Sequence, residues 1–565
     1  MVVVVGNTLY STNASVLILG MRCAADLAKC PLKAMNKSLP VIVQQILDII
    51  RQTGNTESEL VQVAFKSLGT VLRDGPPVQV KEKDLIYLIE LLSPDLEEPT
   101  RQASVFALLR AIVARKFVVP EIYDLMAKVS EVAVTSQSPQ VQELCRGVLL
   151  QFLLDYPQGK GRLQKQMGFF ANNLSYIHES GRTSIMEILG AVIIKFQANL
   201  IQEYADMLFV ALVMVIANDE SAKCREMAAQ LLKNLWTRVD EERQAILLSH
   251  LHSWISQTSK PLLTWVSVQV YGFIIDVARE DSSPYVSSIL DNLKVCLERS
   301  ASSMSTAEDL EENHQIDVEL EWQLPYHALT VLSKILGVFS DFVKEDNKIS
   351  WKLVVDHLLF PHAWVRTAAS RLLGLFFNSM PVAAPQPDLP AEHPFSGVGM
   401  QTIARKFTQQ LKSEHLDEAL SVQIVKNLFY LGKCFYLVPI IDAAPIDEDA
   451  EDILDDEGGE NVVNAHTQMG GDNLKGLNSP LPWLFSKLSY QIKSGHIARR
   501  SKAASKVTSL SNFPKIYNFL ILTIFSLIGP NNLWLGSVGL LAWLRTWMQP
   551  GWSSSSSTSS RLCID

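Results

Sequence analysis

The chain has few of the residues that disulfide frameworks and metal centres need. Its 565 residues include only seven cysteines, and none of these form a CxxC pair or a zinc-ligand spacing. An odd number of scattered cysteines indicates a reducing compartment. Cys145 and Cys224 fall on apolar helix faces and are expected to be small buried residues. The sequence therefore predicts neither a disulfide scaffold nor a zinc domain.

Catalytic motifs are missing as well. The sequence contains no Walker loop, GxGxxG, GxSxG or HExxH pattern. Its carboxylates cluster in polar runs, where no burial would raise their pKa for acid–base chemistry. We therefore expect a protein that is not an enzyme, with no catalytic, metal-binding or cofactor-binding residues.

The chain also lacks an excess of basic residues. Its 50 Lys and Arg are outnumbered by 59 Asp and Glu, and the formal net charge is −9. A basic footprint over the whole chain is excluded, so any RNA contact has to come from a local surface. One basic segment, 479–506, also contains Tyr490 and His496, which could stack on bases. The predicted RNA or nuclear-import contacts in it are Lys487, Lys493, Arg499, Arg500, Lys502 and Lys506. A solvated helix face remains the alternative interpretation.

What the sequence does have is a repeat. Six stretches follow one pattern, in which two medium apolar residues and a small residue precede a leucine-rich ridge. They begin at Leu60, Thr100, Val141, Cys224, Trp265 and Val365. Successive intervals of 40, 41 and 41 residues separate 60 from 100, 100 from 141, and 224 from 265. The gap from 141 to 224 holds a degraded copy near Arg182, and a further copy begins at Leu324.

The repeat predicts stacked helix pairs. Apolar residues recur at i, i+3, i+4, i+7 and i+8, which is helical periodicity. A period of about 41 residues is typical of HEAT or armadillo repeats. A small residue stands four positions after most anchors, where a paired helix would approach closely. These small residues are Ala64, Ser104, Cys145, Ala228 and Ala369. We expect an all-α, HEAT/armadillo-like α-solenoid over residues 1–440, which acts as a binding surface.

Three polar residues near the turns of the repeats are candidates for structural contacts. Asp219 is expected to cap the helix that follows it, because its carboxylate can accept a backbone N–H. Arg225 and Arg366 occupy equivalent positions in their repeats and are predicted, with Asp219, to form an inter-repeat ladder. A phosphate contact for the two arginines is the less favoured alternative.

Polar and acidic runs interrupt the period. The run from Ser300 to Gln315 lengthens one repeat by about 18 residues and is expected to be a surface loop. Residues 441–478 contain a run acidic enough to repel itself, which predicts a disordered linker. A contact for basic proteins is its alternative role. The basic helical segment 479–506 follows this linker.

Residues 507–565 form an atypical hydrophobic and Ser-rich tail. Two apolar runs, Phe519 to Ile528 and Leu533 to Leu544, are parted by a Gly-Pro-Asn-Asn break. A spanning helix needs about 20 continuous apolar residues, and neither run reaches that length. A membrane anchor is therefore the minor alternative, and an exposed apolar appendage is the expectation.

Three stretches of the sequence are more distinctive than the repeats. They are LPYHALTVLSKILGVF from Leu324, WKLVVDHLLFPHAWVRTAASRLLGLFF from Trp351, and LPWLFSKLSYQIKSGHIARR from Leu481. The chain thereby resembles the C-terminal part of the family of component twenty of the small-subunit processome, also called down-regulated-in-metastasis. This resemblance extends from near the N-terminus to about Lys506.

The resemblance implies a nucleolar scaffold. Members of this family are HEAT-repeat proteins that associate with the small nucleolar ribonucleoprotein guiding early cleavage of pre-rRNA. It also implies processome proteins as partners, a role in small-subunit rRNA maturation, a nucleolar or nuclear location and no catalytic residues. Two alternatives stay open from the residues themselves, namely a generic HEAT-repeat transport or signalling adaptor and a tail-anchored membrane protein.

Overall fold

A computed structural model describes residues 1–159, 161–312, 320–344, 348–379, 393–411 and 418–437. Every regular element within these residues is a helix, and the predicted all-α solenoid is confirmed. The segments 441–478, 479–506 and 507–565 lie outside the described residues, and so do the six basic residues predicted to contact RNA.

The chain divides into two compact units. Unit 1 comprises residues 1–302 and 323–342, and unit 2 comprises residues 303–322 and 343–565. The helices that begin in unit 1 are α1 (Val2–Thr8), α2 (Ala14–Ala28), α3 (Lys33–Thr53), α4 (Glu59–Asp74), α5 (Glu82–Leu92), η1 (Pro94–Leu96), α6 (Gln102–Ala114), α7 (Glu121–Thr135), α8 (Pro139–Asp155), α9 (Arg162–Asn173), α10 (Glu179–Lys195), α11 (Ala198–Asn218), α12 (Ala222–Trp236), α13 (Glu241–Ile255), α14 (Pro261–Ala278), η2 (Arg279–Ser282), α15 (Ser283–Glu312), α16 (Gln323–Val338) and η3 (Ser340–Lys344). Unit 2 contains α17 (Trp351–Asp356), η4 (His357–Leu359), α18 (Ala363–Ser379), α19 (Gly397–Leu411) and α20 (Glu418–Leu437).

The sequence repeat coincides with the second helix of each pair. Its anchors fall on or directly before α4, α6, α8, α10, α12, α14, α16 and α18, which we call the second helices. The degraded copy near Arg182 is α10, a full helix of 17 residues. The period found in the sequence is therefore the distance from one second helix to the next.

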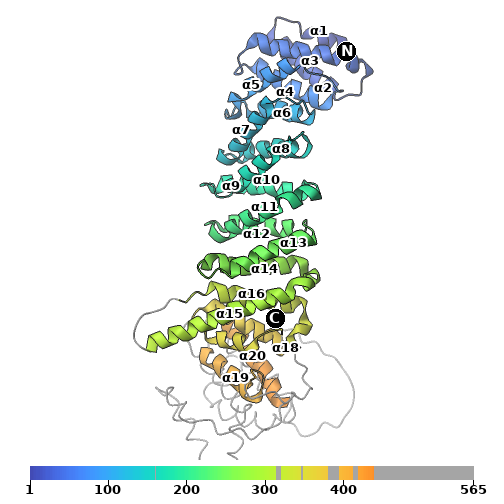
Figure 1. The fold of residues 1–565 in the computed structure, drawn as a ribbon. Helices are drawn as coiled ribbons and strands as arrows, with labels where there is room; N and C mark the ends of the chain where they lie inside the picture. Colours follow the sequence, from blue (N-terminus) through green and yellow to red (C-terminus); the bar gives the residue numbers. More distant parts are fainter. Residues whose placement is uncertain (160, 313–319, 345–347, 380–392, 412–417, 438–565) are drawn as a thin grey trace, which may run out of the picture. The chain divides into compact units, whose positions relative to one another are not determined.

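Within unit 1 the second helices stack in chain order, as Figure 1 shows from α4 to α16. Each packs directly against the next one, and the first helices α5, α9 and α11 contact their own neighbours α7, α11 and α13. A helix pair buries only part of its apolar surface alone, so this stacking supplies the continuous core. By length and composition, α11 and the segment Pro261–Thr306 could cross a membrane, and half of the apolar window of each is buried inside the structure.

The small residues of the repeat lie where the helices meet. Ala64, Cys145, Ala228 and Ala369 are completely buried, and Ser104 is 8% exposed. α4 approaches α6 closely at Gly69, where an added Cβ would lie 2.9 Å from the carbonyl oxygen of Ala107. Bulk is excluded at such positions because the interior is packed to near-crystalline density.

The loop predicted between Ser300 and Gln315 is wrong over most of its length. α15 continues without interruption to Glu312. The run contains Ala, Met, Leu and Glu and neither Gly nor Pro, so its residues favour a helix although they are polar. The polar residues of this run therefore continue α15 and do not form a loop.

Candidate interface on the second helices

A recurring polar side chain closes the turn before each of six second helices. In each case a Gln or Arg in the first turns of the helix donates to the carbonyl oxygen six residues earlier, over 2.6–2.9 Å. The donors are Gln62, Gln102, Gln142, Arg182, Arg225 and Arg366. These side chains satisfy carbonyl groups at or near the end of the preceding helical segment, which would otherwise lack partners.

This network gives Arg225 and Arg366 contacts that differ from the predicted ones. Arg225 and Arg366 donate to carbonyls within their own repeats, and neither reaches a neighbouring repeat in the contacts of the described residues. Asp219 does join two repeats, because its carboxylate binds the guanidinium of Arg182. The N-cap of α12 is Ser221, whose backbone N–H donates to Asp219.

Further inter-repeat contacts lie at the other end of the second helices. Arg115, just after α6, donates to the carbonyls of Leu72 and Gly75 at the end of α4. Arg238 repeats this arrangement from the end of α12, with 2.8 Å to the carbonyl of Ile194. A cation at a helix C-terminus also interacts favourably with the helix dipole. In the sequence this contact is marked by an Arg one or two residues after the second helix. The repeat pattern does not include that position, so the contact was not predicted.

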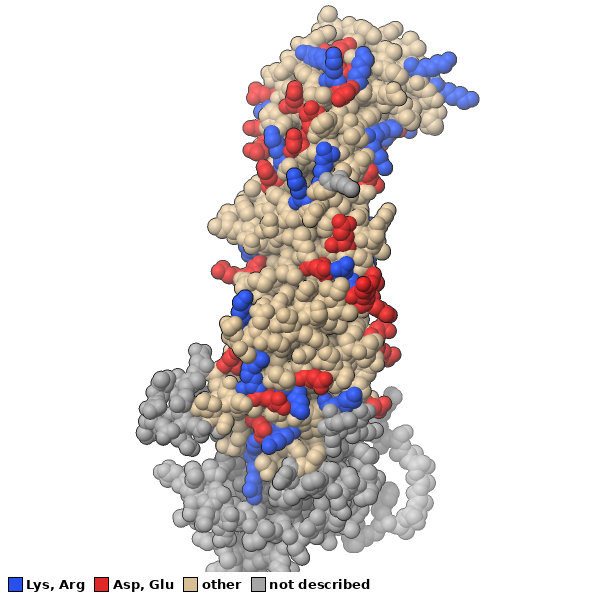
Figure 2. Space-filling model, viewed as in Figure 1, with Lys and Arg blue, Asp and Glu red and all other residues tan. Residues whose placement is uncertain are grey.

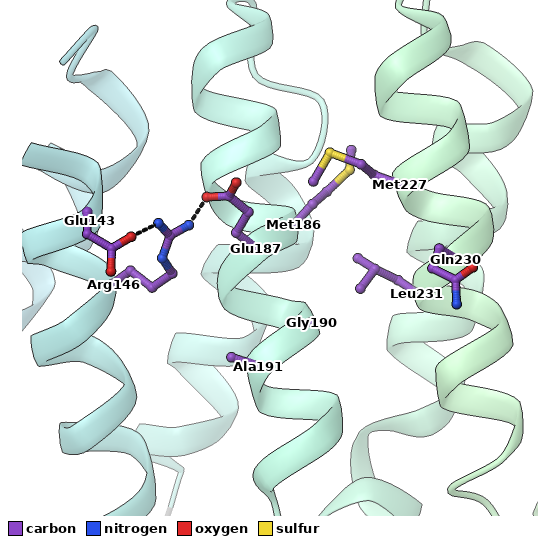
Figure 3. A pocket seen from close by; sticks show the side chains of 9 residues that line it. All are labelled: Glu143, Arg146, Met186, Glu187, Gly190, Ala191, Met227, Gln230 and Leu231. Atoms are coloured by element: carbon purple, nitrogen blue, oxygen red, sulfur yellow. Dashed lines mark hydrogen bonds and ion pairs between the residues drawn. The ribbon is translucent and has the colours of Figure 1, made fainter. Parts of the chain in front are cut away.

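A groove runs across α8, α10 and α12 on the surface of the second helices. It has a volume of about 490 Å³ and is mainly apolar. The lining residues are Glu143, Arg146, Met186, Glu187, Gly190, Ala191, Met227, Gln230 and Leu231. Figure 3 shows them on three successive helices, with the two methionines facing each other between α10 and α12.

The groove exists because α10 has small residues where its neighbours have larger ones. The turn-closing donors Gln142, Arg182 and Arg225 set a common register for the three helices. Eight and nine residues after Arg182 stand Gly190 and Ala191. The equivalent residues are Leu150 and Gln151 on α8, and Lys233 and Asn234 on α12. The degraded copy of the sequence repeat, α10, is therefore the helix whose small residues form the floor of the groove.

The charged edge of the groove is a three-residue cluster. Arg146 on α8 binds both Glu143, one turn earlier, and Glu187 on α10, as Figure 3 shows. The two carboxylates remain 69% and 48% exposed, whereas Arg146 is 19% exposed. One guanidinium thus serves two carboxylates, and the edge has a formal charge of −1.

A second charged cluster lies on the same series of helices. Lys233 of α12 and Lys334 of α16 both bind Asp276 of α14, at 3.3 and 2.8 Å. Both ammonium groups also lie over the ring of Phe273, at 5.3 and 5.8 Å from its centroid. Figure 2 shows acidic and basic side chains intermixed on the visible face, without a continuous basic stripe. Each lysine is already paired, so the cluster connects the repeats.

Unit 2 presents an aromatic cluster at the start of α18. Trp322 is stacked on His362 with ring centroids 4.3 Å apart, and Trp364 stands edge-on to Trp322 at 4.9 Å. Trp364 is 56% exposed. Burial lowers the pKa of His362, so its ring is neutral near pH 7 and stacks without a charge. The rings contact one another and form an aromatic cluster with Trp364 exposed at the surface.

Comparisons with solved structures return karyopherins, while no family model matches the chain. Kap121p bound to RanGTP is 14% identical, with a TM-score of 0.45, over 92% of this chain and 46% of that chain. Importin beta is 12% identical, with a TM-score of 0.35, over 90% of this chain and 56% of that chain.

Comparisons with curated proteins return longer relatives. U3 small nucleolar RNA-associated protein 20 of Schizosaccharomyces pombe is 32% identical over 448 residues, which are 78% of this chain and 17% of the relative. The protein of the same name from Saccharomyces cerevisiae is 28% identical over 423 residues, 75% of this chain and 16% of the relative. The chain thus spans about a sixth of the length of the curated relatives that it matches.

Proposed function

We propose a scaffold function for this chain. The premise is that the chain is homologous to a part of U3 small nucleolar RNA-associated protein 20. This relationship confirms the predicted resemblance to the processome family. The chain would act in the small-subunit processome, and hence in ribosome biogenesis, as a binding surface for other components. The sequence identity over three quarters of the chain is the observation that carries this proposal.

The architecture of unit 1 supports a scaffold. Stacked repeats present many helix faces in a row, and their extended surfaces are typical of proteins that bind partners. In the residues that the structure describes, several titratable groups form ion pairs between repeats, such as Arg182 with Asp219. We therefore propose binding without catalysis, and without a cofactor.

The partners follow from the names of the relatives. Those proteins are described as associated with U3 small nucleolar RNA. We propose that this chain joins the same ribonucleoprotein, contacts processome proteins, and resides in the nucleolus. Direct contact with pre-rRNA would come from the basic segment 479–506, outside the described residues.

Affinity purification of the tagged full chain from nuclear extract tests this proposal. U3 small nucleolar RNA and precursors of small-subunit rRNA should be enriched over an unrelated nuclear RNA. Depleting the protein should make those precursors accumulate. Enrichment of nuclear-pore proteins or a small GTPase, with no enrichment of U3 RNA, would support the transport adaptor and contradict the scaffold. Resistance of the protein to carbonate extraction from membranes would support the tail anchor.

A further inference from the structure

We propose that the groove across α8, α10 and α12 binds a short peptide segment of a partner protein, in which a large apolar side chain is flanked by Lys or Arg. The apolar side chain would lie against Met227 and the small residues Gly190 and Ala191, and the cation would bind Glu187 at the edge. The inference rests on the proposed function only for the source of the peptide, a protein of the same assembly.

The size of the groove fits a short peptide segment and not a folded domain. A volume of about 490 Å³ lies within the range of small-ligand sites. Its floor is low because Gly190 and Ala191 replace the larger residues of the neighbouring repeats. The space at Gly190 is limited by α12, since an added Cβ would lie 3.0 Å from Cδ2 of Leu231. Replacing these small residues would therefore close the groove.

The apolar lining extends beyond the groove along two helices. Glu187, Gly190, Ala191 and Ile194 share one face of α10, because residues three, four and seven positions apart lie above one another. Ile194 is 59% exposed. On α8, Leu154 lies eleven residues after Glu143 on the same face and is 37% exposed. A peptide longer than its anchor residue would cover these side chains as well.

The methionines make the lining adaptable. Met186 is buried, and Met227 is half-buried on the facing helix. Unbranched thioether side chains change rotamer at low cost and fit irregular apolar partners. Surfaces rich in such side chains accept related sequences and not only one. We therefore infer a class of apolar anchors, such as Leu, Phe or Met.

The charge of the edge selects the flanking residues. Glu143 and Glu187 share a single guanidinium, and each carboxylate has lone pairs enough for further donors. A Lys or Arg beside the apolar anchor would offset the remaining negative charge. The same charge opposes an RNA backbone, which binds through cationic side chains. A basic and apolar peptide is thus the occupant that fits both parts of the site.

A direct binding measurement tests the proposal. The probe is the fluorescein-labelled peptide Gly-Lys-Lys-Leu-Phe-Lys-Gly, titrated with the purified full chain and followed by fluorescence anisotropy. Two control peptides carry Ser in place of Leu and Phe, or Glu in place of the lysines. We expect the probe to bind and both control peptides to bind at least about tenfold more weakly, as for the loss of a charge-assisted contact.

Three variants of the protein complete the test. Glu187→Arg changes the edge and Ala191→Phe fills the groove, and each should weaken binding of the probe by about tenfold. Glu90→Arg makes the same charge change on an exposed residue of α5 and should leave binding unchanged. If Ala191→Phe fails to fold, Glu187→Arg still tests the peptide site, because the side chain of Glu187 is 48% exposed and can be replaced without disturbing the core.

Several results would overturn the peptide site. They are no binding of the probe, equal binding of the Ser peptide, equal effects of Glu187→Arg and Glu90→Arg, or displacement of the probe by single-stranded oligouridine. The assay contains no U3 RNA, so its outcome is independent of the co-purification that tests the scaffold function. A negative result for the peptide site would not contradict the scaffold function, and the reverse also holds.

Discussion

Arg182 of α10 holds Asp219 at the end of α11 through two parallel hydrogen bonds, Nε to Oδ2 at 2.7 Å and Nη2 to Oδ1 at 2.9 Å. The same guanidinium donates to the carbonyl oxygen of Tyr176, which closes its own repeat. One side chain therefore joins the internal turn of a repeat to the next repeat. The side chains are 13% and 4% exposed, so the pair is well shielded from water.

Breaking this pair should destabilise unit 1. Asp219→Asn removes the charge and leaves the guanidinium of Arg182 partly buried without its counterion, which costs about 3 kcal/mol in comparable pairs. Glu220→Gln is the matched control, because Glu220 is exposed and next in the chain. Urea unfolding should show the loss for Asp219→Asn alone. Hydrogen exchange should increase first in α10 to α12, because repeats couple to their neighbours. Equal stability of the two variants would contradict this role.

A carboxylate in the packed core of unit 1 should be severely destabilising. Ala228 on α12 is completely buried, so Ala228→Asp would place a charge where water has no access. Losses above about 4 kcal/mol come from such buried unpaired groups. Ala222→Asp, at the exposed start of the same helix, should be nearly neutral. Thermal unfolding of the two variants, with limited proteolysis to locate the opened repeat, distinguishes them. An unchanged melting curve for Ala228→Asp would refute the packing.

Gly69 and Gly168 provide a second matched pair. An added Cβ at Gly69 would lie 2.9 Å from the carbonyl oxygen of Ala107, whereas nothing lies within 4 Å of one at Gly168. Gly69→Ala should destabilise the protein by about 1–3 kcal/mol through overpacking of α4 on α6. Gly168→Ala should stabilise α9 by up to about 1 kcal/mol, the difference in helix propensity. Chemical denaturation measures both, and the reverse order would contradict the close approach.

Acid should destabilise unit 1 through His327. The imidazole is stacked on Trp265 at 5.4 Å, and burial followed by the charge of Lys334 lowers the pKa of His327 to about 4. The unfolded chain binds a proton near the ordinary value of 6.5, so the folded state binds fewer protons at intermediate pH. This contribution to stability is present above pH 6.5 and is lost as the pH falls towards about 4.

The variant His327→Gln removes that titration. Its melting temperature should fall less steeply between pH 7 and pH 5 than that of the wild type. The comparison cancels the other histidines, which titrate in both proteins. Parallel pH profiles would show that His327 is not the group responsible.

The basic segment should contact RNA through its charge. Reversal of Arg499 and Arg500 to Glu is expected to weaken crosslinking to RNA, and the remaining binding should depend less on salt because fewer counterions are released. Reversal of Lys29 and Lys33, in the α2–α3 region, is the control with the same change in charge. Nuclear import is measured in parallel. If both readouts are unaffected, the segment is an ordinary solvated surface.

The helix pairs and their order could be predicted from the amino-acid sequence. Anchors about 41 residues apart predicted the second helices correctly, even at the degraded copy around Arg182. The buried small residues followed from the same pattern, as Ala228 and Ala369 illustrate. Helical periodicity is a local property, because neighbouring apolar residues on one face have to be buried together whatever covers them. The run after Ser300 was misjudged because polarity does not distinguish a loop from a solvated helix.

The residues that meet between repeats could not be predicted and are seen only in the folded chain. Asp219 pairs with Arg182, which lies 37 residues earlier, while Arg225 turns back to the carbonyl of Asp219 in its own repeat. Both arginines occur six residues after a turn, so the sequence pattern treats them alike. The groove at Gly190 likewise appears only when α8 and α12 are placed on either side of α10. Contacts between repeats depend on the spacing and register of separate helices, and these are fixed by packing over the whole stack rather than by the residues of one helix.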